Sequence, residues 1–389
     1  MRTLSDFRFP GRLISSRGAS GELGPVLDGL GSSGHVFLVA DPVVRSLGLL
    51  DGIVAGLEAG GRDVTIFDGI DREPTSVDVQ SGIELAKQVE ATVFVGVGGG
   101  SALDSTKMIA LGTRLSVQIG DVTGQQMPVA GFPTLVLIPT TTGTGSEATR
   151  IAMYTHAGHK RAIASAQFVP DVAVLDADLV DGLPPAILAA TALDALSHAI
   201  ESMMSTTSNS LTELIAGEAA RLIFTHLLEA QSPDAAASRE TLLYASFLGG
   251  VALNAGVVLG HSLSYVLAAH YGLSHGGGCA LALPYCIAYN GAMDDTRGGE
   301  IARRVLGDPR ATLQDLAHAS RRLAADAGLP TALGDLPLPG ADPATMAREL
   351  VTDYPRPTNP VTLDADRLTS LIAAMETGDL DRAWKAMNP

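Results

Sequence analysis

Asp194 and His198 lie four residues apart in the Ala- and Leu-rich segment TALDALSHAIES (191–202). In a helix this spacing places both side chains on one face, one turn apart. A carboxylate and an imidazole in that arrangement can bind the same metal ion. A polar helix face has the same pattern, so the pair alone does not decide between the two interpretations.

Three more histidines follow in GHSLSYVLAAHYGLSHGGG (260–278), namely His261, His270 and His275. Their surroundings are apolar, and an unpaired polar group buried among apolar side chains costs free energy. Any one of them alone could be a hydrogen-bonded core residue. Together with Asp194 and His198, they supply the nitrogen and oxygen donors that suit Fe(II) or Zn(II).

A glycine-rich segment, GVGGGSALDSTK (96–107), follows the apolar run ATVFV (91–95). Free backbone N–H groups at the start of the following helix attract a phosphate, and glycine lets that phosphate approach. The segment matches neither G-x-G-x-x-G nor the G-K-[ST] phosphate loop. A tight turn is the alternative, but one glycine suffices for a turn. We therefore predict nucleotide binding here.

Two further features belong with this loop. PTTTGTGSEAT (139–149) follows another expected strand, and its hydroxyls could hydrogen-bond a ribose, although plain turns have similar compositions. Asp41 ends the run VFLVAD (36–41). A carboxylate there can accept from a ribose 2′-hydroxyl and repel a 2′-phosphate, which favours NAD over NADP. A helix N-cap before Pro42 is the other interpretation.

The elements that position these residues divide the chain in two. Expected helices at 43–60 and 78–90 alternate with short apolar runs, which predicts a mostly parallel sheet covered by helices. The runs lie at 36–41, 63–69, 91–98, 134–140 and 172–178. After DADLVDGLPP (176–185) the pattern is helical throughout. We predict an α/β NAD-binding domain at 1–180 and an all-helical metal-binding domain at 181–389.

Composition limits the partners. The net charge of −16 argues against nucleic acid, which needs a basic face. Cys279 and Cys286 are too few for a disulfide framework, so we expect both to be reduced. The N-terminus has no signal-peptide core, and no segment has eighteen uninterrupted apolar residues. We expect a cytoplasmic protein with no membrane partner.

With these residues in view, the chain resembles the iron-containing (group III) alcohol dehydrogenase family over nearly its whole length. Four blocks agree in order: GGGSALDSTK, PTTTGTGSEAT, LDADLVDGLPPAILAATALDALSHAIES and GHSLSYVLAAHYGLSHGGGCALALPYCIAYN, with a weaker fifth in TNPVTLDADRL. The resemblance implies a Rossmann-like dinucleotide-binding domain and an all-α metal-binding domain, the architecture of dehydroquinate synthase.

The resemblance also implies roles for individual residues. The family's metal ligands correspond to Asp194, His198, His261 and His275, which leaves His270 outside the set. The residues expected to bind the cofactor are Asp41, Gly98, Gly99, Gly100, Ser101, Asp104, Thr140, Thr141 and Lys160. Read without the family, Lys160 is a surface cation.

Two positions depart from many family members. Tyr265 lies where several members have a second histidine near the substrate, so we expect Tyr265 or a water chain to relay the proton. Arg150 follows GTGSEAT, where many members have an uncharged residue. It could hold a carboxylate or phosphonate of the substrate, or it could be an exposed strand-edge arginine.

The predicted function is a metal-dependent, NAD(P)(H)-linked alcohol dehydrogenase or aldehyde reductase acting on a small primary alcohol or aldehyde, which could bear an anionic group. Fe(II) is the expected metal and NAD the expected dinucleotide, with Zn(II) and NADP left open. A glycerol-dehydrogenase-like enzyme, a dehydroquinate-synthase-like enzyme and a non-catalytic nucleotide-binding protein are the alternatives. We expect a homodimer, because FRFPGRLI (7–14) could pair as an edge strand with a second copy.

Overall fold

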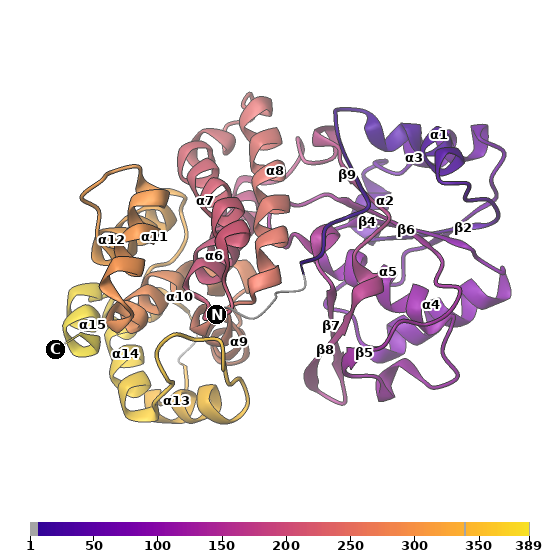
Figure 1. Ribbon diagram of the computed structural model, residues 1–389. Coiled ribbons are helices and arrows are strands. Elements are labelled where there is room, and N and C mark those ends of the chain that lie inside the picture. Colours follow the sequence, from indigo (N-terminus) through magenta and orange to yellow (C-terminus); the bar gives the residue numbers. More distant parts are fainter. Residues whose placement is uncertain (1–6, 338–339, 389) are drawn as a thin grey trace. The chain divides into compact units, whose positions relative to one another are not determined.

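The computed structural model describes residues 7–337 and 340–388. The chain divides into two compact units, Phe7–Gly182 and a second that begins at Leu183. The sequence predicted a division near residue 180. Each unit has an apolar core of its own, and Figure 1 shows strands only in the first unit.

The first unit is built on a six-stranded parallel sheet in the order β1-β9-β6-β4-β2-β3. The strands are β1 Arg12–Ser15, β2 Val36–Ala40, β3 Val64–Phe67, β4 Val93–Gly98, β6 Thr134–Pro139 and β9 Val172–Leu175. Every residue of β2, β4 and β9 is buried. Uninterrupted apolar runs of this kind are typical of parallel strands covered on both faces.

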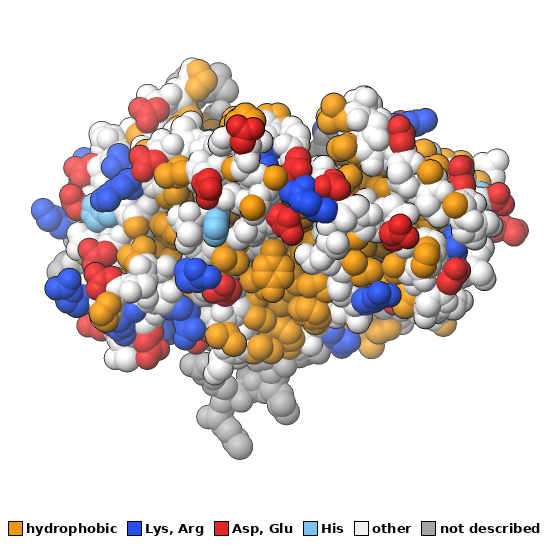
Figure 2. All heavy atoms as spheres, turned by 90° about the horizontal axis from the view of Figure 1, so that it is seen from above, with side chains coloured by type: hydrophobic (Ala, Val, Ile, Leu, Met, Phe, Trp, Pro, Cys, Tyr) orange, Lys and Arg blue, Asp and Glu red, His pale blue; other side chains and the backbone are white. Residues whose placement is uncertain are grey.

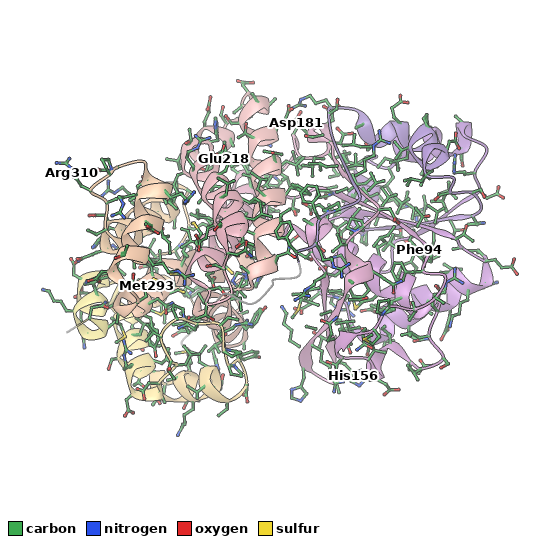
Figure 3. All side chains as sticks on the ribbon, viewed as in Figure 1. Phe94, His156, Asp181, Glu218, Met293 and Arg310 are labelled. Atoms are coloured by element: carbon green, nitrogen blue, oxygen red, sulfur yellow. The ribbon has the colours of Figure 1, made fainter. Side chains whose placement is uncertain are left out.

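The helices of this unit cover both faces of the sheet. They are α1 Leu23–Gly29, α2 Pro42–Ser46, α3 Asp51–Ala59, α4 Ser76–Gln88 and α5 Gly100–Gly112. Successive residues of β2 pack on opposite faces of the sheet, in two separate apolar cores. Leu38 packs with α1 and α3, whereas Phe37 packs with α4 and α5. Figure 3 shows Phe94 of β4 deep among the side chains of this unit.

The expected helix at 43–60 is interrupted. It divides into α2 and α3, and Gly48 lies between them with a positive φ of 72°. This conformation suits glycine and ends a helix.

A second, three-stranded sheet was not predicted. It comprises β5 Gly124–Gln126, β7 Ile151–His156 and β8 His159–Ser165, with β7 and β8 antiparallel. Ala157 and Gly158 form the hairpin turn with φ of 50° and 79°. His156 at the end of β7 is labelled in Figure 3. The apolar residues of β7 form only a short run, and β8 contains Lys160 and Arg161, so the hairpin gave no clear strand signal.

The second unit contains helices and no strand among its described residues, which confirms the predicted fold class. The helices are α6 Pro185–Met204, α7 Ser210–Ala230, α8 Ala236–Ala252, α9 Leu259–Tyr271, α10 His275–Tyr289, α11 Asp295–Leu306, α12 Leu313–Asp326, α13 Pro343–Thr352, α14 Ala365–Thr377 and α15 Leu380–Met387. Helix α10 is buried from Gly277 to its end, and it packs against α6, α9, α12 and α15. It is the central helix of this core.

No single helix in the described ranges is long and apolar enough to cross a membrane. Two consecutive helical segments, Ala236–Ala255 and Leu259–Tyr271, together have the length and apolar composition of a membrane span, but they are bent by 109° relative to each other. Figure 2 shows acidic and basic side chains interspersed on the face in view, with no continuous basic surface there.

Candidate metal centre and nucleotide-binding loops

Helix α6 places Asp194 and His198 on one buried face. Pro184 and Pro185 lie at its start, and a proline is tolerated in the first turn because that N–H has no partner within the helix. Asp194 is 3 % exposed and His198 is 5 % exposed. The Nε2 atom of His198 lies 3.7 Å from Oδ1 of Asp194, as the four-residue spacing predicted.

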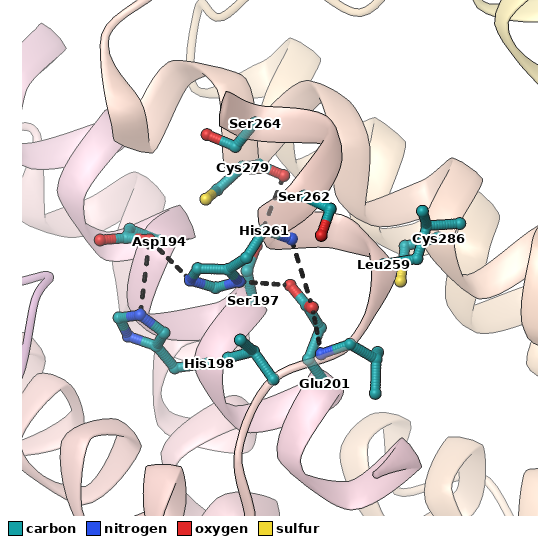
Figure 4. A network of polar contacts seen from close by, with 12 residues as sticks. Asp194, Ser197, His198, Glu201, Leu259, His261, Ser262, Ser264, Cys279 and Cys286 are labelled. Carbon is teal, nitrogen blue, oxygen red and sulfur yellow. Dashed lines mark hydrogen bonds and ion pairs between the residues drawn. The ribbon is translucent and has the colours of Figure 1, made fainter. Parts of the chain in front are cut away.

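Helices α9 and α10 bring the other two predicted ligands to the same carboxylate oxygen, and Figure 4 shows His198 and His261 beside Asp194. The Nε2 atoms of His261 and His275 lie 3.7 Å and 3.5 Å from Oδ1 of Asp194. The short connection between these helices makes this meeting feasible: Gly272 ends α9 in the left-handed region, and the Ser274 side chain caps α10.

The donor chemistry of this cluster, and the distances of its imidazoles from Asp194, fit a divalent cation, although His198 is not in the compact group of donor atoms that Asp194, His261 and His275 form. Oδ1 of Asp194 and Nε2 of His261 are buried and have no hydrogen-bond partner among the described residues. Leaving two such atoms unpaired is costly unless a ligand satisfies them. Donor atoms about 2.1 Å from a common ion in tetrahedral geometry lie about 3.4 Å apart. The observed 3.5–3.7 Å separations from Asp194 Oδ1 are close to that value.

Glu201 orients His261, although it was not among the predicted site residues. It is fully buried on α6, and its Oε1 lies 2.7 Å from Nδ1 of His261. A carboxylate on Nδ1 fixes the tautomer that leaves Nε2 free to bind a metal. The spacing of Asp194, His198 and Glu201 at i, i+4 and i+7 is the signal that could have found it.

Glycines allow these helices to approach. A Cβ at Gly260 would collide with the Glu201 carboxylate, and one at Gly276 would collide with the backbone oxygen of Ala190 on α6. The Ser264 hydroxyl lies 3.2 Å from Nδ1 of His275 and donates to its backbone oxygen.

Cys279 was also missed as a neighbour of the site. Its sulfur lies 3.8 Å from Nε2 of His275, and it forms a compact donor group with Asp194, His261 and His275. Burial, together with the nearby carboxylates of Asp194 and Glu201, raises the pKa of this thiol well above its usual value. Cys279 and Cys286 are both free thiols.

His270 lies outside the cluster, in agreement with its exclusion from the ligand set. His270 is nine residues from His261, which corresponds to about two and a half turns of helix. The two side chains therefore lie on opposite faces of α9. Nε2 of His270 pairs with Oε2 of Glu349 at 2.8 Å. Tyr265, the expected proton relay, stacks on His275 with ring centroids 5.6 Å apart and planes at 19°.

The predicted phosphate loop joins β4 to α5 in the sheet unit. Gly99 is the N-cap residue of α5, so the free N–H groups of the first turn lie where the sequence placed them. The glycines also have a reason within the protein. A Cβ at Gly98 would collide with Asp41 and Ala102, and one at Gly100 would press on Thr144.

The threonine-rich loop lies against the glycine loop. The N–H of Thr140 donates to the oxygen of Gly98, and Thr141 is the nearest side chain to Gly99. Lys107 on α5 is fully buried and fastens the second loop by donating to Ser146, Thr149 and the backbone oxygen of Ile151. The two segments therefore form one surface.

The remaining predicted cofactor residues have partners within the protein. Oδ2 of Asp41 accepts from the N–H of Gly99 at 2.9 Å, and burial raises the pKa of this carboxyl. Asp104 accepts from Ser146 and from the N–H of Met153. Lys160 lies on β8, 3.1 Å from Glu73.

Ser101 is in the first turn of α5, beside the loop. Arg150 directly precedes β7 in the sheet unit, partly buried, and its backbone oxygen accepts from Ser165. Their predicted roles at the pyrophosphate and at an acidic substrate group stay predictions.

The chain combines a parallel sheet that has a glycine loop at its carboxyl edge with a carboxylate that lies among three imidazoles. This combination is expected of a metal-dependent, dinucleotide-linked dehydrogenase. The comparisons with known proteins agree. The iron-containing alcohol dehydrogenase family matches residues 10–177, and the C-terminal part of that family matches residues 188–375.

Individual relatives match over nearly the full length. An NAD-dependent methanol dehydrogenase of Bacillus methanolicus is 30% identical over 367 residues, which cover 92% of this chain and 96% of that protein. A crystal structure of 1,3-propanediol oxidoreductase has a TM-score of 0.89 at 29% identity, covering 96% of this chain and 100% of that one. Sulfoacetaldehyde reductase from Bifidobacterium kashiwanohense, in complex with NAD+, has a TM-score of 0.88 at 26% identity, covering 96% and 99%.

The chain belongs to the iron-containing alcohol dehydrogenase family. It is a metal-dependent alcohol dehydrogenase or aldehyde reductase of that family, as the sequence predicted.

Proposed function

We propose that this protein reduces small aldehydes with NADH, and oxidises the matching primary alcohols with NAD, using Fe(II) held by Asp194, His198, His261 and His275. One observation supports this proposal above all. Three imidazole nitrogens lie 3.5–3.7 Å from a single buried carboxylate oxygen that has no hydrogen-bond partner among the described residues.

A divalent ion bound there supplies Lewis acidity, which polarises a carbonyl oxygen or lowers the pKa of an alcohol. The dinucleotide supplies or accepts the hydride. The protein contributes positioning: Glu201 holds the His261 ring, and Tyr265 covers one face of the His275 ring. The Tyr265 hydroxyl is the group we assign to proton relay.

NAD is the proposed dinucleotide because Asp41 lies beside the glycine loop. A carboxylate at this edge of the sheet accepts from a ribose 2′-hydroxyl and repels a 2′-phosphate. Two relatives agree in their names, one as NAD-dependent and one as an NAD+ complex. Fe(II) is proposed over Zn(II) on the family's description, since the donor set accepts either metal.

We also propose a homodimer. Strand β1 is an edge strand of its sheet, paired only with β9 among the described strands, so its other edge can pair with a second copy. Light scattering at micromolar concentration measures the oligomeric state directly. A cytoplasmic location stays a prediction.

Two histidines on the same helix provide the test of the ligand assignment. His261→Ala removes an imidazole whose Nε2 faces Asp194, whereas His270→Ala removes one that pairs with Glu349 outside the cluster. We expect the first variant to lose bound metal and turnover while NAD binding stays measurable, and the second to keep all three. Metal analysis of anaerobically purified protein and NADH oxidation with an aldehyde panel are the measurements.

The same assay separates the related enzyme classes. A dehydroquinate-synthase-like reaction has no net redox change, so it would leave the NADH absorbance constant. Normal turnover by His261→Ala, or full activity after complete metal removal, would overturn the proposed metal role.

A further inference from the structure

Arg356 belongs to the segment that joins α13 to α14, two helices labelled in Figure 1. Its side chain contacts Tyr265 and Ser262 of α9, the helix that carries the proposed ligand His261. Its Cζ atom is 5.6 Å from the centroid of the Tyr265 ring, within the range of a cation–π interaction. Tyr265 in turn stacks on His275 at 5.6 Å. The Cζ atom of Arg356 is therefore no further from the centroid of the His275 ring than the sum of these two distances.

The position of Arg356 is fixed from several directions. Its Nε donates to the Ser262 hydroxyl at 2.8 Å, and that hydroxyl donates to the backbone oxygen of Tyr354. Ser262 directly follows the proposed ligand His261. Pro355 and Pro357 flank Arg356 and restrict its backbone.

Asn359 fastens the same segment to the start of α9. Its Oδ1 accepts from the N–H of Leu259 and from Nδ2 of Asn290, and its Nδ2 donates to the oxygen of Val361. Asn359 belongs to the fifth sequence block, so this block anchors the segment that carries Arg356 although it holds no metal ligand.

Arg356 has no acidic partner among the residues that the structure describes. Some arginines of this chain form ion pairs, among them Arg17, Arg45, Arg62 and Arg221, and others, among them Arg161 and Arg367, have none among the described residues. Arg356 is partly buried, and only its Nε hydrogen bond is occupied. The two Nη groups present a planar pair of donors that fits a carboxylate bidentately.

We propose that Arg356 binds an acidic group of the substrate, so that the preferred substrate is a short aldehyde with a terminal carboxylate. The inference rests on the proposed function and refines it. The overall reaction is RCHO + NADH + H+ → RCH₂OH + NAD+, with R bearing the carboxylate. Arg356 takes no part in hydride or proton transfer. It is a positioning residue that fixes the far end of the substrate while the carbonyl is at the metal cluster.

The test compares two aldehydes of equal carbon number, 4-oxobutanoate and butanal, with iron-loaded protein and NADH. We expect the wild type to have the higher kcat/KM for 4-oxobutanoate. Arg356→Gln should lower the ratio of the two kcat/KM values by about 10- to 100-fold, mainly through KM, because it removes a charge-assisted hydrogen-bonded pair. Arg356→Lys should recover part of the ratio.

Arg310→Gln is the matched control, because it removes a guanidinium that is 91 % exposed. We expect it to keep the wild-type ratio. Arg150→Gln tests the other candidate for the acidic group. A turnover-independent readout is competitive inhibition by butanoate, which should weaken in Arg356→Gln in parallel with KM.

Several outcomes would overturn the inference: no wild-type preference for 4-oxobutanoate, equal losses for both aldehydes in Arg356→Gln, or loss of the ratio in Arg150→Gln instead. Failure of the proposed function has a different signature, because NADH would then be consumed with neither aldehyde.

Discussion

Glu201 allows a sharp test of the metal centre, because its carboxylate is fully buried and makes three hydrogen-bond contacts. Oε1 faces Nδ1 of His261 at 2.7 Å, and Oε2 accepts from the N–H of Val258 at 2.8 Å and from the N–H of His261 at 3.3 Å. Glu201→Gln keeps the shape but offers one acceptor and one donor in place of two acceptors.

Either orientation of the new amide leaves a mismatch. If its oxygen keeps the Val258 N–H, its NH₂ group faces Nδ1 of His261 and favours the tautomer with the proton on Nε2, the atom that faces Asp194. If the amide is reversed, two N–H donors meet at Val258. Loss of such a partner typically lowers metal affinity about 10- to 100-fold, or about 1.4–2.7 kcal/mol. A buried unsatisfied N–H costs about 1–3 kcal/mol of unfolding free energy.

The assay is competition for the metal with a chromophoric chelator, together with thermal unfolding of the metal-free protein. Glu349→Gln is the matched control, because Glu349 forms a similar pair with His270 away from the cluster. Gly260→Ala should act in the same direction as Glu201→Gln, because its Cβ would displace the Glu201 carboxylate. Wild-type metal affinity in Glu201→Gln would refute the reasoning.

Two further predictions concern other buried groups. Burial raises the pKa of Glu147 from 4.5 to about 7. Between these two pH values the folded state therefore binds more protons than the unfolded state, so the free energy of unfolding falls as the pH rises. The contribution of this group is up to about 1.4 kcal/mol per pH unit. Glu147→Gln should remove that slope in denaturant unfolding measured from pH 4.5 to 7, whereas exposed Glu58→Gln should keep it; an unchanged slope in Glu147→Gln contradicts the assignment. At the metal centre, Cys279→Ala should keep the metal affinity within about threefold of the wild type. His198→Ala should lower the metal affinity at least about tenfold, because His198 Nε2 is as close to the shared Asp194 oxygen as His261 Nε2 is. The opposite ranking in chelator competition would place the sulfur in the ligand set.

Much of the fold could be predicted from local sequence. The strands of the main sheet are continuous apolar runs, since both faces of a parallel sheet are buried, and five of the six were located from that signal. For the edge strand β1, the sequence predicted only that this segment could pair with a second copy of the chain. The hairpin of β7 and β8 was missed because it lies apart from this sheet, with a weaker apolar pattern.

The sequence by itself determined which residues could do chemistry: an Asp and a His four apart on one helix, histidines in apolar surroundings, and glycines at a helix start. Helical periodicity carries this information because it relates residues within a few turns. Tertiary structure decided which of those residues meet. Glu201 reaches His261 across sixty residues, and Arg356 reaches Ser262 across ninety-four, only because α6, α9 and the segment after α13 pack together. No local pattern encodes such contacts, since they depend on how buried helices fit against one another.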